Sequence, residues 1–399
     1  MRKLSLAIIG LYIGVLGAFS QSASDSAVYK NKKLTPTEIN FITSYYHQDG
    51  NLSPVTGGIG TEKLSDYATT FEIKLNKYDQ HNRRHDLGFE LGVDHYTSAS
   101  SDKIDPGIVS SPSYADTRIY PTISYGISNE QKGNAVNFTG SYSGEYDYQS
   151  IGGGAGFTNT SKDKNTEFTL KGQAYLDHLK VILPVELRAG TSQARGQQNY
   201  PSAARNSYSG SLVFSHLVNQ RFQFSLLGDV VYQNGYLGTP FHRIYFSDGI
   251  ETNEKLPSSR LKIPIGLRMN YFAGDKFIVR SFYRFYHDDW GLTAHTLDVE
   301  LPVKITSFIS ISPFYRFYTQ NGVKYFAGYK QHQSSEAFYT TDDDLSKFNS
   351  NSEGAEIRLG QPGGIFNIKH LNNIELRYAH YKRTDGLHSD IVTLALKFI

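Results

Sequence analysis

The chain of 399 residues contains no cysteine, only one tryptophan and no excess of charge of either sign. The absence of cysteine excludes disulfide bonds, a lipid-modified cysteine anchor, thiolate metal sites and covalently attached haem. The mean hydropathy of −0.42 excludes a helical membrane protein, which would need several apolar runs of about twenty residues. Because the net charge is only +2, the composition implies no polyanionic partner, and we expect no nucleic-acid binding.

Other aromatic residues are abundant. Tyrosine occurs 29 times and phenylalanine 24 times, and aromatic residues make up 14% of the chain. This usage is typical of membrane β-barrels, in which aromatic girdles lie at both lipid–water interfaces. A single tryptophan is unusual for such a protein.

The stretch from Thr296 to Ile305 alternates strictly between apolar and polar residues. Because successive side chains on a strand point to opposite faces, one face here is apolar and the other carries charge. The flanking segments repeat the pattern, and Phe-Tyr-Arg-Phe-Tyr occurs at both 282–286 and 314–318. With short connections, Asp298 would lie roughly opposite both Arg284 and Arg316. The charged residues of this face are Arg280, Arg284, Asp298, Glu300, Lys304 and Arg316.

A soluble sandwich hides its apolar face, whereas a membrane β-barrel turns that face to lipid and its polar face to the lumen. Short connections are predicted at 129–134, 161–165, 219–221, 274–275 and 306–307, and long ones at 50–62, 98–114, 178–205, 236–259 and 322–353. Short periplasmic turns and long external loops are typical of outer-membrane barrels. We therefore predict one antiparallel transmembrane β-barrel over residues 36–399, with about sixteen strands and a range of about 14 to 18.

The N-terminus indicates export. Arg2 and Lys3 precede an apolar run that ends near Phe19, and small residues follow it. This pattern predicts a signal peptide at 1–20, followed by a short polar leader at 21–35. The sequence therefore predicts the outer membrane of a Gram-negative cell as the location, with outer-membrane lipid around the barrel.

Several segments resemble one family. They are SYYHQDGNLSPVTGGIGTEKL (44–64), YTSASSDKIDP (96–106), ADTR (115–118), PFHRIYF (240–246), RFYHDDWGLTAHT (284–296) and YTTDDDLSKF (339–348). Together they resemble domain-of-unknown-function family 3570, outer-membrane barrels common in the Bacteroidota. The resemblance implies the outer membrane and a single barrel, but no activity. Members are often encoded near flavin-attachment and thioredoxin-like proteins, which implies an indirect role beside an extracytoplasmic redox system. This chain has no flavin or haem attachment motif, so no cofactor is expected.

Asp288, Asp289 and His295 are predicted at the external rim of a hairpin. Carboxylates beside a histidine could activate water, which would make the protein a surface hydrolase. A tight turn with aspartate capping and Trp290 packed on it explains the same residues, and we favour the turn. The expectation is that the protein is not an enzyme.

Three adjacent carboxylates, Asp342, Asp343 and Asp344, are weak candidates for binding Ca²⁺ through their oxygen atoms. They lack the alternating spacing of a helix–loop–helix calcium site. A solvated acidic loop, or the cap of a short helix at 345–348, is favoured, so no metal site is predicted here.

Two further loops hold candidate binding residues. Gly57, Gly58 and Gly60 lack the lysine of a phosphate-binding loop, and we expect them to fold a constricting loop across the barrel mouth with positive φ. His242 and Arg243 lie between aromatic residues in another loop. They could contact an anionic ligand or lipopolysaccharide, but we favour a structural role in which the aromatic residues anchor the loop.

The lumen charges allow two interpretations. They could set the selectivity of a pore for a small solute, or they could form a paired network that fills a closed barrel. The predicted function is therefore a porin-like channel or solute-binding barrel with a loop-constricted mouth. The alternative is a structural or accessory barrel that docks a periplasmic or surface protein.

Overall fold

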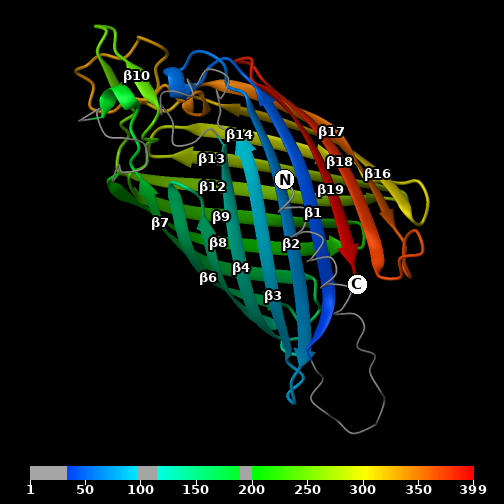
Figure 1. Cartoon of the computed structure of the whole chain (residues 1–399). Helices are drawn as coiled ribbons and strands as arrows, with labels where there is room; N and C mark the ends of the chain where they lie inside the picture. The colour runs from blue at the N-terminus through cyan, green and yellow to red at the C-terminus, as the bar shows by residue number, and fades with distance from the viewer. Residues whose placement is uncertain (1–33, 98–114, 189–199) are drawn as a thin grey trace. The chain divides into compact units, whose positions relative to one another are not determined.

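The computed structural model describes residues 34–97, 115–188 and 200–399. The predicted signal peptide, nearly all of the leader, and the loop at 98–114 lie outside these residues. Within the described part, sixteen antiparallel strands close into a barrel, which confirms the predicted fold class and strand number (Figure 1). The first strand pairs with the last, from Ile39 opposite Phe398 to Asp49 opposite His388, so the barrel has no free sheet edge.

The strands of the barrel wall follow one another in chain order. The first nine are β1 (Thr35–Asp49), β2 (Leu64–Tyr78), β3 (Arg84–Thr97), β4 (Ala115–Asn129), β5 (Asn134–Gly144), β6 (Tyr148–Thr160), β7 (Thr166–Lys180), β8 (Ser202–Asn219) and β9 (Phe222–Gly235). The others are β12 (Ser259–Ala273), β13 (Phe277–Asp288), β14 (Thr293–Glu300) continued by β15 (Val303–Lys304), β16 (Ile309–Gln320), β17 (Phe348–Gly360), β18 (Leu371–Arg383) and β19 (His388–Phe398).

A small hairpin of β10 (Arg243–Tyr245) and β11 (Glu251–Asn253) projects from one loop and is separate from the barrel sheet (Figure 1). Three single-turn 3₁₀ helices also lie in loops: η1 (Pro54–Thr56), η2 (Val185–Leu187) and η3 (Asp343–Leu345). Among the described residues, no helix is both long and apolar enough to cross a membrane.

The two faces of the sheet divide the side chains as the alternation predicts. Leu297 and Tyr315 share one face and are exposed, whereas Asp298 and Arg316 share the other. Arg377 on β18 reaches Glu300 on β14, although β16 and β17 lie between these strands. Such a contact requires side chains that converge, so the charged face is the concave, lumenal one. The apolar face is therefore the outer surface, as in outer-membrane barrels.

The two ends of the barrel differ in the length of their connections. One end carries the residues 79–83, 130–133, 161–165, 220–221, 274–276, 305–308 and 361–370. The other carries the long connections, which include 50–63, 236–258 and 321–347 among the residues that the structure describes. The five predicted short turns are confirmed. Connections 145–147, 289–292 and 384–387 are short although they lie at the long-loop end, which is the external end by analogy with other barrels.

Candidate functional site

A ladder of ion pairs lies on the lumenal face of β13 to β18. Arg316 contacts Asp298 at 2.7 Å, and Arg280 contacts Glu300 at 2.7 Å. Arg377 extends the ladder, since it lies 3.2 Å from Glu356 and 3.7 Å from Glu300. The predicted charged face is therefore assembled, with several strands contributing to one network.

Arg284 does not lie opposite Asp298, as predicted, but two residues further along β13. Asp298 pairs with Arg316 on one side, as predicted, but with Phe282 on the other, while Arg284 pairs with Thr296. The turn between β13 and β14 sets this register, and a shift of two residues keeps the same face. Arg284 instead lies over the ring of Tyr286, 5.9 Å from its centroid.

The aromatic ring of Phe314 packs against the ladder of ion pairs. The Arg377 guanidinium lies 3.9 Å from the Phe314 ring centroid, so its charge rests on an aromatic face. Gly354 makes room for that ring, because an added Cβ there would lie 2.8 Å from Phe314 and 2.0 Å from the Tyr378 carbonyl oxygen. The glycine is thus required by close packing within the wall.

Some of the charged residues that face the lumen form no ion pair with another described residue. In the described part of the chain, Lys262, Arg268 and Arg284 form no ion pair with a carboxylate. On the far side, the same holds for the inward-facing carboxylates Asp66, Glu90, Asp94 and Asp116. Lys304 also faces the lumen, opposite Ser310 near the short-turn end.

The charges are segregated around the barrel. On β2 to β4 the inward-facing charged residues are Asp66, Glu72, Asp86, Glu90, Asp94 and Asp116 against Lys74, Arg84 and Arg118. On β12 and β13 they are Arg260, Lys262, Arg268, Arg280 and Arg284 against Asp288. β3 and β13 lie eight strands apart in a barrel of sixteen and so face each other. The lumen thus has an acidic wall opposite a basic wall.

The external loops interlock into a loop cap, which we define as residues 50–63, 181–188, 236–258 and 321–347. Arg243 joins all four segments. Its Nη1 donates to the Val55 carbonyl at 2.5 Å, its Nε donates to Glu186 at 2.5 Å, and its own carbonyl accepts from the Thr341 hydroxyl at 3.1 Å. Arg243 and His242 are both buried, so neither is presented to an external anionic ligand or to lipopolysaccharide, and the geometry supports the favoured structural role of this pair.

The glycine-rich loop belongs to this cap. Gly57, Gly58 and Gly60 have φ values of 84°, 83° and 83°, as the expectation of positive φ requires. An added Cβ at Gly57 would lie 2.6 Å from the Tyr245 ring, so the loop packs directly against the β10–β11 hairpin. The glycines therefore permit the cap to close, although their part in binding or constriction remains a prediction.

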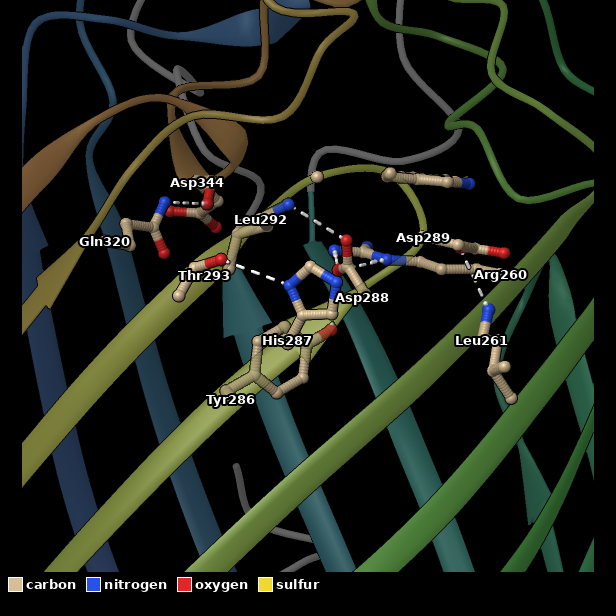
Figure 2. Close-up of polar contacts among 12 residues, drawn as sticks. Arg260, Leu261, Tyr286, His287, Asp288, Asp289, Leu292, Thr293, Gln320 and Asp344 are labelled. Atoms are coloured by element: carbon tan, nitrogen blue, oxygen red, sulfur yellow. Dashed lines mark hydrogen bonds and ion pairs between the residues drawn. The ribbon is translucent and has the colours of Figure 1, made fainter.

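The turn between β13 and β14 is anchored by Asp288 (Figure 2). Its carboxylate accepts from Arg260 Nε at 2.9 Å, from the Tyr286 hydroxyl at 2.8 Å and from the Leu292 amide at 3.0 Å. Trp290 is buried, lies 4.3 Å from the Arg260 guanidinium and donates to the Ser259 carbonyl at 2.9 Å. The favoured turn with a capping aspartate and a packed tryptophan matches this arrangement.

The candidate hydrolytic group is not brought together. His295 lies on the outer face of β14, opposite Phe285, and its Nδ1 contacts the Tyr283 hydroxyl at 2.8 Å. Asp288 points to the lumen, on the other face of the sheet. Asp289 is exposed and accepts from the Leu261 amide at 3.1 Å (Figure 2). A histidine and a carboxylate on opposite faces cannot act on one substrate.

The three adjacent aspartates diverge. Asp342 caps η3 by accepting from the Asp344 amide at 3.0 Å, and Asp344 pairs with Arg383 at 2.5 Å. The helix spans Asp343–Leu345 and not the predicted 345–348, because the capping aspartate is the first of the three. A calcium site built from all three carboxylates is therefore not assembled.

Glu62, Asp343, Arg383 and Asp385 lie close together where the cap meets β18. Burial, reinforced by Asp344, raises the pKa of Glu62 to about 8. Burial, reinforced by Asp385, raises the pKa of Asp343 to about 7. Both carboxyls therefore hold protons more tightly in the folded cap than in an unfolded chain.

We expect the loop cap to become less stable as the pH rises. Protons bound at Glu62 and Asp343 stabilise the folded form at low pH, and this contribution is lost between the ordinary carboxyl range and pH 8. Hydrogen-exchange protection of 50–63, corrected for intrinsic rates, should be higher at pH 6 than at pH 9. Glu62→Gln should reduce this difference, and equal wild-type protection at both pH values would refute it.

The model of a family described as "Protein of unknown function (DUF3570)" matches residues 97–390. No curated protein sequence matches the chain. A mutant of the ferric enterobactin receptor PfeA from Pseudomonas aeruginosa is similar at 11% identity, over 86% of this chain and 53% of the receptor, with a TM-score of 0.44. The chain thus spans about half of that receptor's length.

Two barrels of similar size also match. OpdK from P. aeruginosa is 8% identical over 90% of this chain and 97% of its own, with a TM-score of 0.41. OccD3 (OpdP) from the same organism is 8% identical over 92% and 93%, with a TM-score of 0.45. Similarities this weak carry no information about solute or mechanism.

Proposed function

The chain belongs to the DUF3570 family of proteins of unknown function, and we propose that it is an outer-membrane channel for small charged or zwitterionic solutes. The solute would pass beneath the loop cap and between an acidic and a basic wall. The observation that carries this proposal is the segregation of charge across the lumen, with β2 to β4 acidic and β12 and β13 basic.

Opposite charges on facing walls create a field across the lumen. Low-dielectric walls focus such a field, which raises the local concentration of charged solutes and orients dipolar ones. A network built only to fill a closed barrel would place its charges in contact pairs, because an unpaired ion in a low dielectric is costly. Arg268 and Arg284 face Glu90 and Asp94 across the barrel without such pairing, which favours a hydrated lumen.

Three strands opposite the ladder of ion pairs present small, mostly hydroxyl-bearing or glycine residues to the lumen. Inward positions on β5, β6 and β8 carry small residues, namely Thr139, Ser141, Gly152, Gly154, Gly156, Ser207, Ser209 and Ser211. This wall lies across the barrel from the ladder of β16 to β18. Hydroxyl groups on one side and paired charges on the other suit a polar solute.

Ion selectivity tests the proposal. Under a salt gradient across a planar bilayer, the reversal potential of Arg268→Ala/Arg284→Ala should shift toward cation preference, because the basic wall loses charge. Glu90→Gln/Asp94→Asn should shift it toward anions. We expect changes of about two- to fivefold in the permeability ratio, equivalent to about 0.4–1 kcal/mol.

Lys382→Ala is the matched control, since Lys382 carries the same charge as the two arginines but lies on the outer face of β18. Its reversal potential should equal that of the wild type. Shifts in the same direction for both lumenal variants, or no shift in either, would contradict the proposal.

The accessory-barrel alternative has one observation in its favour, the interlocking of four loop segments through the buried Arg243. A cap held this tightly suits a docking surface as well as a gate. The two functions differ in conductance once the cap is loosened, because a closed barrel would still carry no ionic current.

A further inference from the structure

The base of the β10–β11 hairpin brings two potential metal ligands side by side. Arg243 and Asn253 form the last pair of the hairpin, so the residues that flank this pair, His242 and Glu254, lie opposite each other. A backbone hydrogen bond of 3.0 Å from the Glu254 amide to the His242 carbonyl fixes this position. Asp342 reaches the same point from the loop between β16 and β17.

The three side chains converge at ligand distances. One potential ligand atom from each lies within 4.8 Å of the other two, and His242 Nδ1 is 3.7 Å from Glu254 Oε1. Two bonds of about 2.0–2.1 Å to a tetrahedral metal place their ligand atoms about 3.3 Å apart. The observed spacing is too long for a hydrogen bond and close to that of two ligands on one ion.

His242 Nδ1 has no hydrogen-bond partner among the described residues. The residue is only 8% exposed, yet its Nδ1 accepts and donates no hydrogen bond. Its nearest carboxylate oxygen, Glu254 Oε1 at 3.7 Å, is beyond hydrogen-bond reach. Buried polar atoms in proteins are nearly always satisfied, and a cation between this nitrogen and the two carboxylates would satisfy it. Neither Glu254 nor Asp342 forms an ion pair with a lysine or arginine among the residues that the structure describes.

The surrounding contacts hold the carboxylates in place. Glu254 Oε2 accepts from the Thr239 amide at 2.5 Å, and its Oε1 accepts from the Thr340 hydroxyl. Asp342 Oδ1 accepts from the Asp344 amide at 3.0 Å. Hydrogen bonds of this kind orient metal-binding carboxylates and raise affinity.

We propose that His242, Glu254 and Asp342 bind one divalent transition-metal ion, and that this ion fastens two loops of the cap together. One imidazole with two carboxylates is a borderline donor set, which suits Zn²⁺ better than Ca²⁺ or Mg²⁺. Since His242 and Glu254 come from 236–258 and Asp342 from 321–347, the ion joins segments that are far apart in sequence. This site differs from the three-aspartate group, of which it uses only Asp342.

The test is zinc binding by the full-length, untagged protein in detergent micelles. After treatment with a chelator and dialysis against micromolar Zn²⁺, we expect about one zinc per chain by elemental analysis. His242→Ala should lower the zinc affinity at least tenfold. Zinc should also increase hydrogen-exchange protection of 236–258 in the wild type but not in the variant.

Two further variants guard against misfolding and non-specific binding. Asp342→Asn keeps an oxygen for the Asp344 amide and should fold, but it should also lower zinc affinity at least tenfold. His295→Ala removes a histidine on the outer face and should bind zinc as the wild type does. The proposal would be overturned if the wild-type protein bound no zinc after dialysis, or if both His242→Ala and Asp342→Asn bound zinc as tightly as the wild type.

Discussion

Asp288→Ala is expected to lower the free energy of unfolding by about 3–5 kcal/mol, because it leaves the largely buried Arg260 side chain, which is 12% exposed, without its carboxylate. Asp288 is 1% exposed and also holds the Tyr286 hydroxyl and the Leu292 amide. Loss of these contacts releases Trp290, which packs on Arg260 and on a small apolar cluster with Leu292 and Val323. Urea unfolding in lipid, followed by the gel mobility of the folded barrel, measures the change.

Asp289 provides the control within the same turn. It is exposed, and its side chain makes one hydrogen bond, to the Leu261 amide. Asp289→Ala should therefore cost about 1 kcal/mol or less. If the two variants were destabilised equally, Asp288 would not be the anchor of this turn.

The second large effect is expected at Arg243. Arg243→Ala removes the side chain that ties Val55 and Glu186 to the β10–β11 hairpin, and it leaves an empty buried space. We expect the loop cap to lose about 2–3 kcal/mol of local stability, which corresponds to about a 30- to 150-fold increase in its open population. Protease cleavage within 236–258 should accelerate by a similar factor while the barrel remains folded.

Lys255→Ala is the matched variant, because Lys255 is an exposed cation of the same loop. Its cleavage rate should remain within about twofold of the wild type, as is usual for an exposed surface substitution. Equal protease sensitivity of wild type and Arg243→Ala would mean that the cap is held by other contacts.

The barrel itself could be predicted from the sequence because its signal is local. Alternation from Thr296 to Ile305 assigns each residue to a face, and turns such as 161–165 and 274–276 punctuate the strands. Pairing of Asp298 with Arg316 follows from one short turn. The position of Arg284 does not, since it depends on where the 289–292 turn begins and ends.

The loop cap could not be predicted in the same way. Val55, Glu186, Arg243 and Thr341 come from four connections, and loops have no periodicity that reports which of them meet. His242 and Glu254 could have been paired as the flanks of a hairpin, but nothing in the sequence places Asp342 beside them. His295 shows the converse case, since its nearness in sequence to Asp288 allowed a shared site as the disfavoured alternative, and strand alternation places the two residues on opposite faces.

Conductance in a planar bilayer tests the central claim most directly. Purified wild-type protein should give stepwise currents, and Arg243→Ala should give larger or longer openings because its cap opens more often. Removing charge from the basic wall should shift their ion preference toward cations, and removing charge from the acidic wall should shift it toward anions. Stable, folded barrels of both proteins that never conduct would contradict a channel and would leave the accessory barrel as the function to pursue.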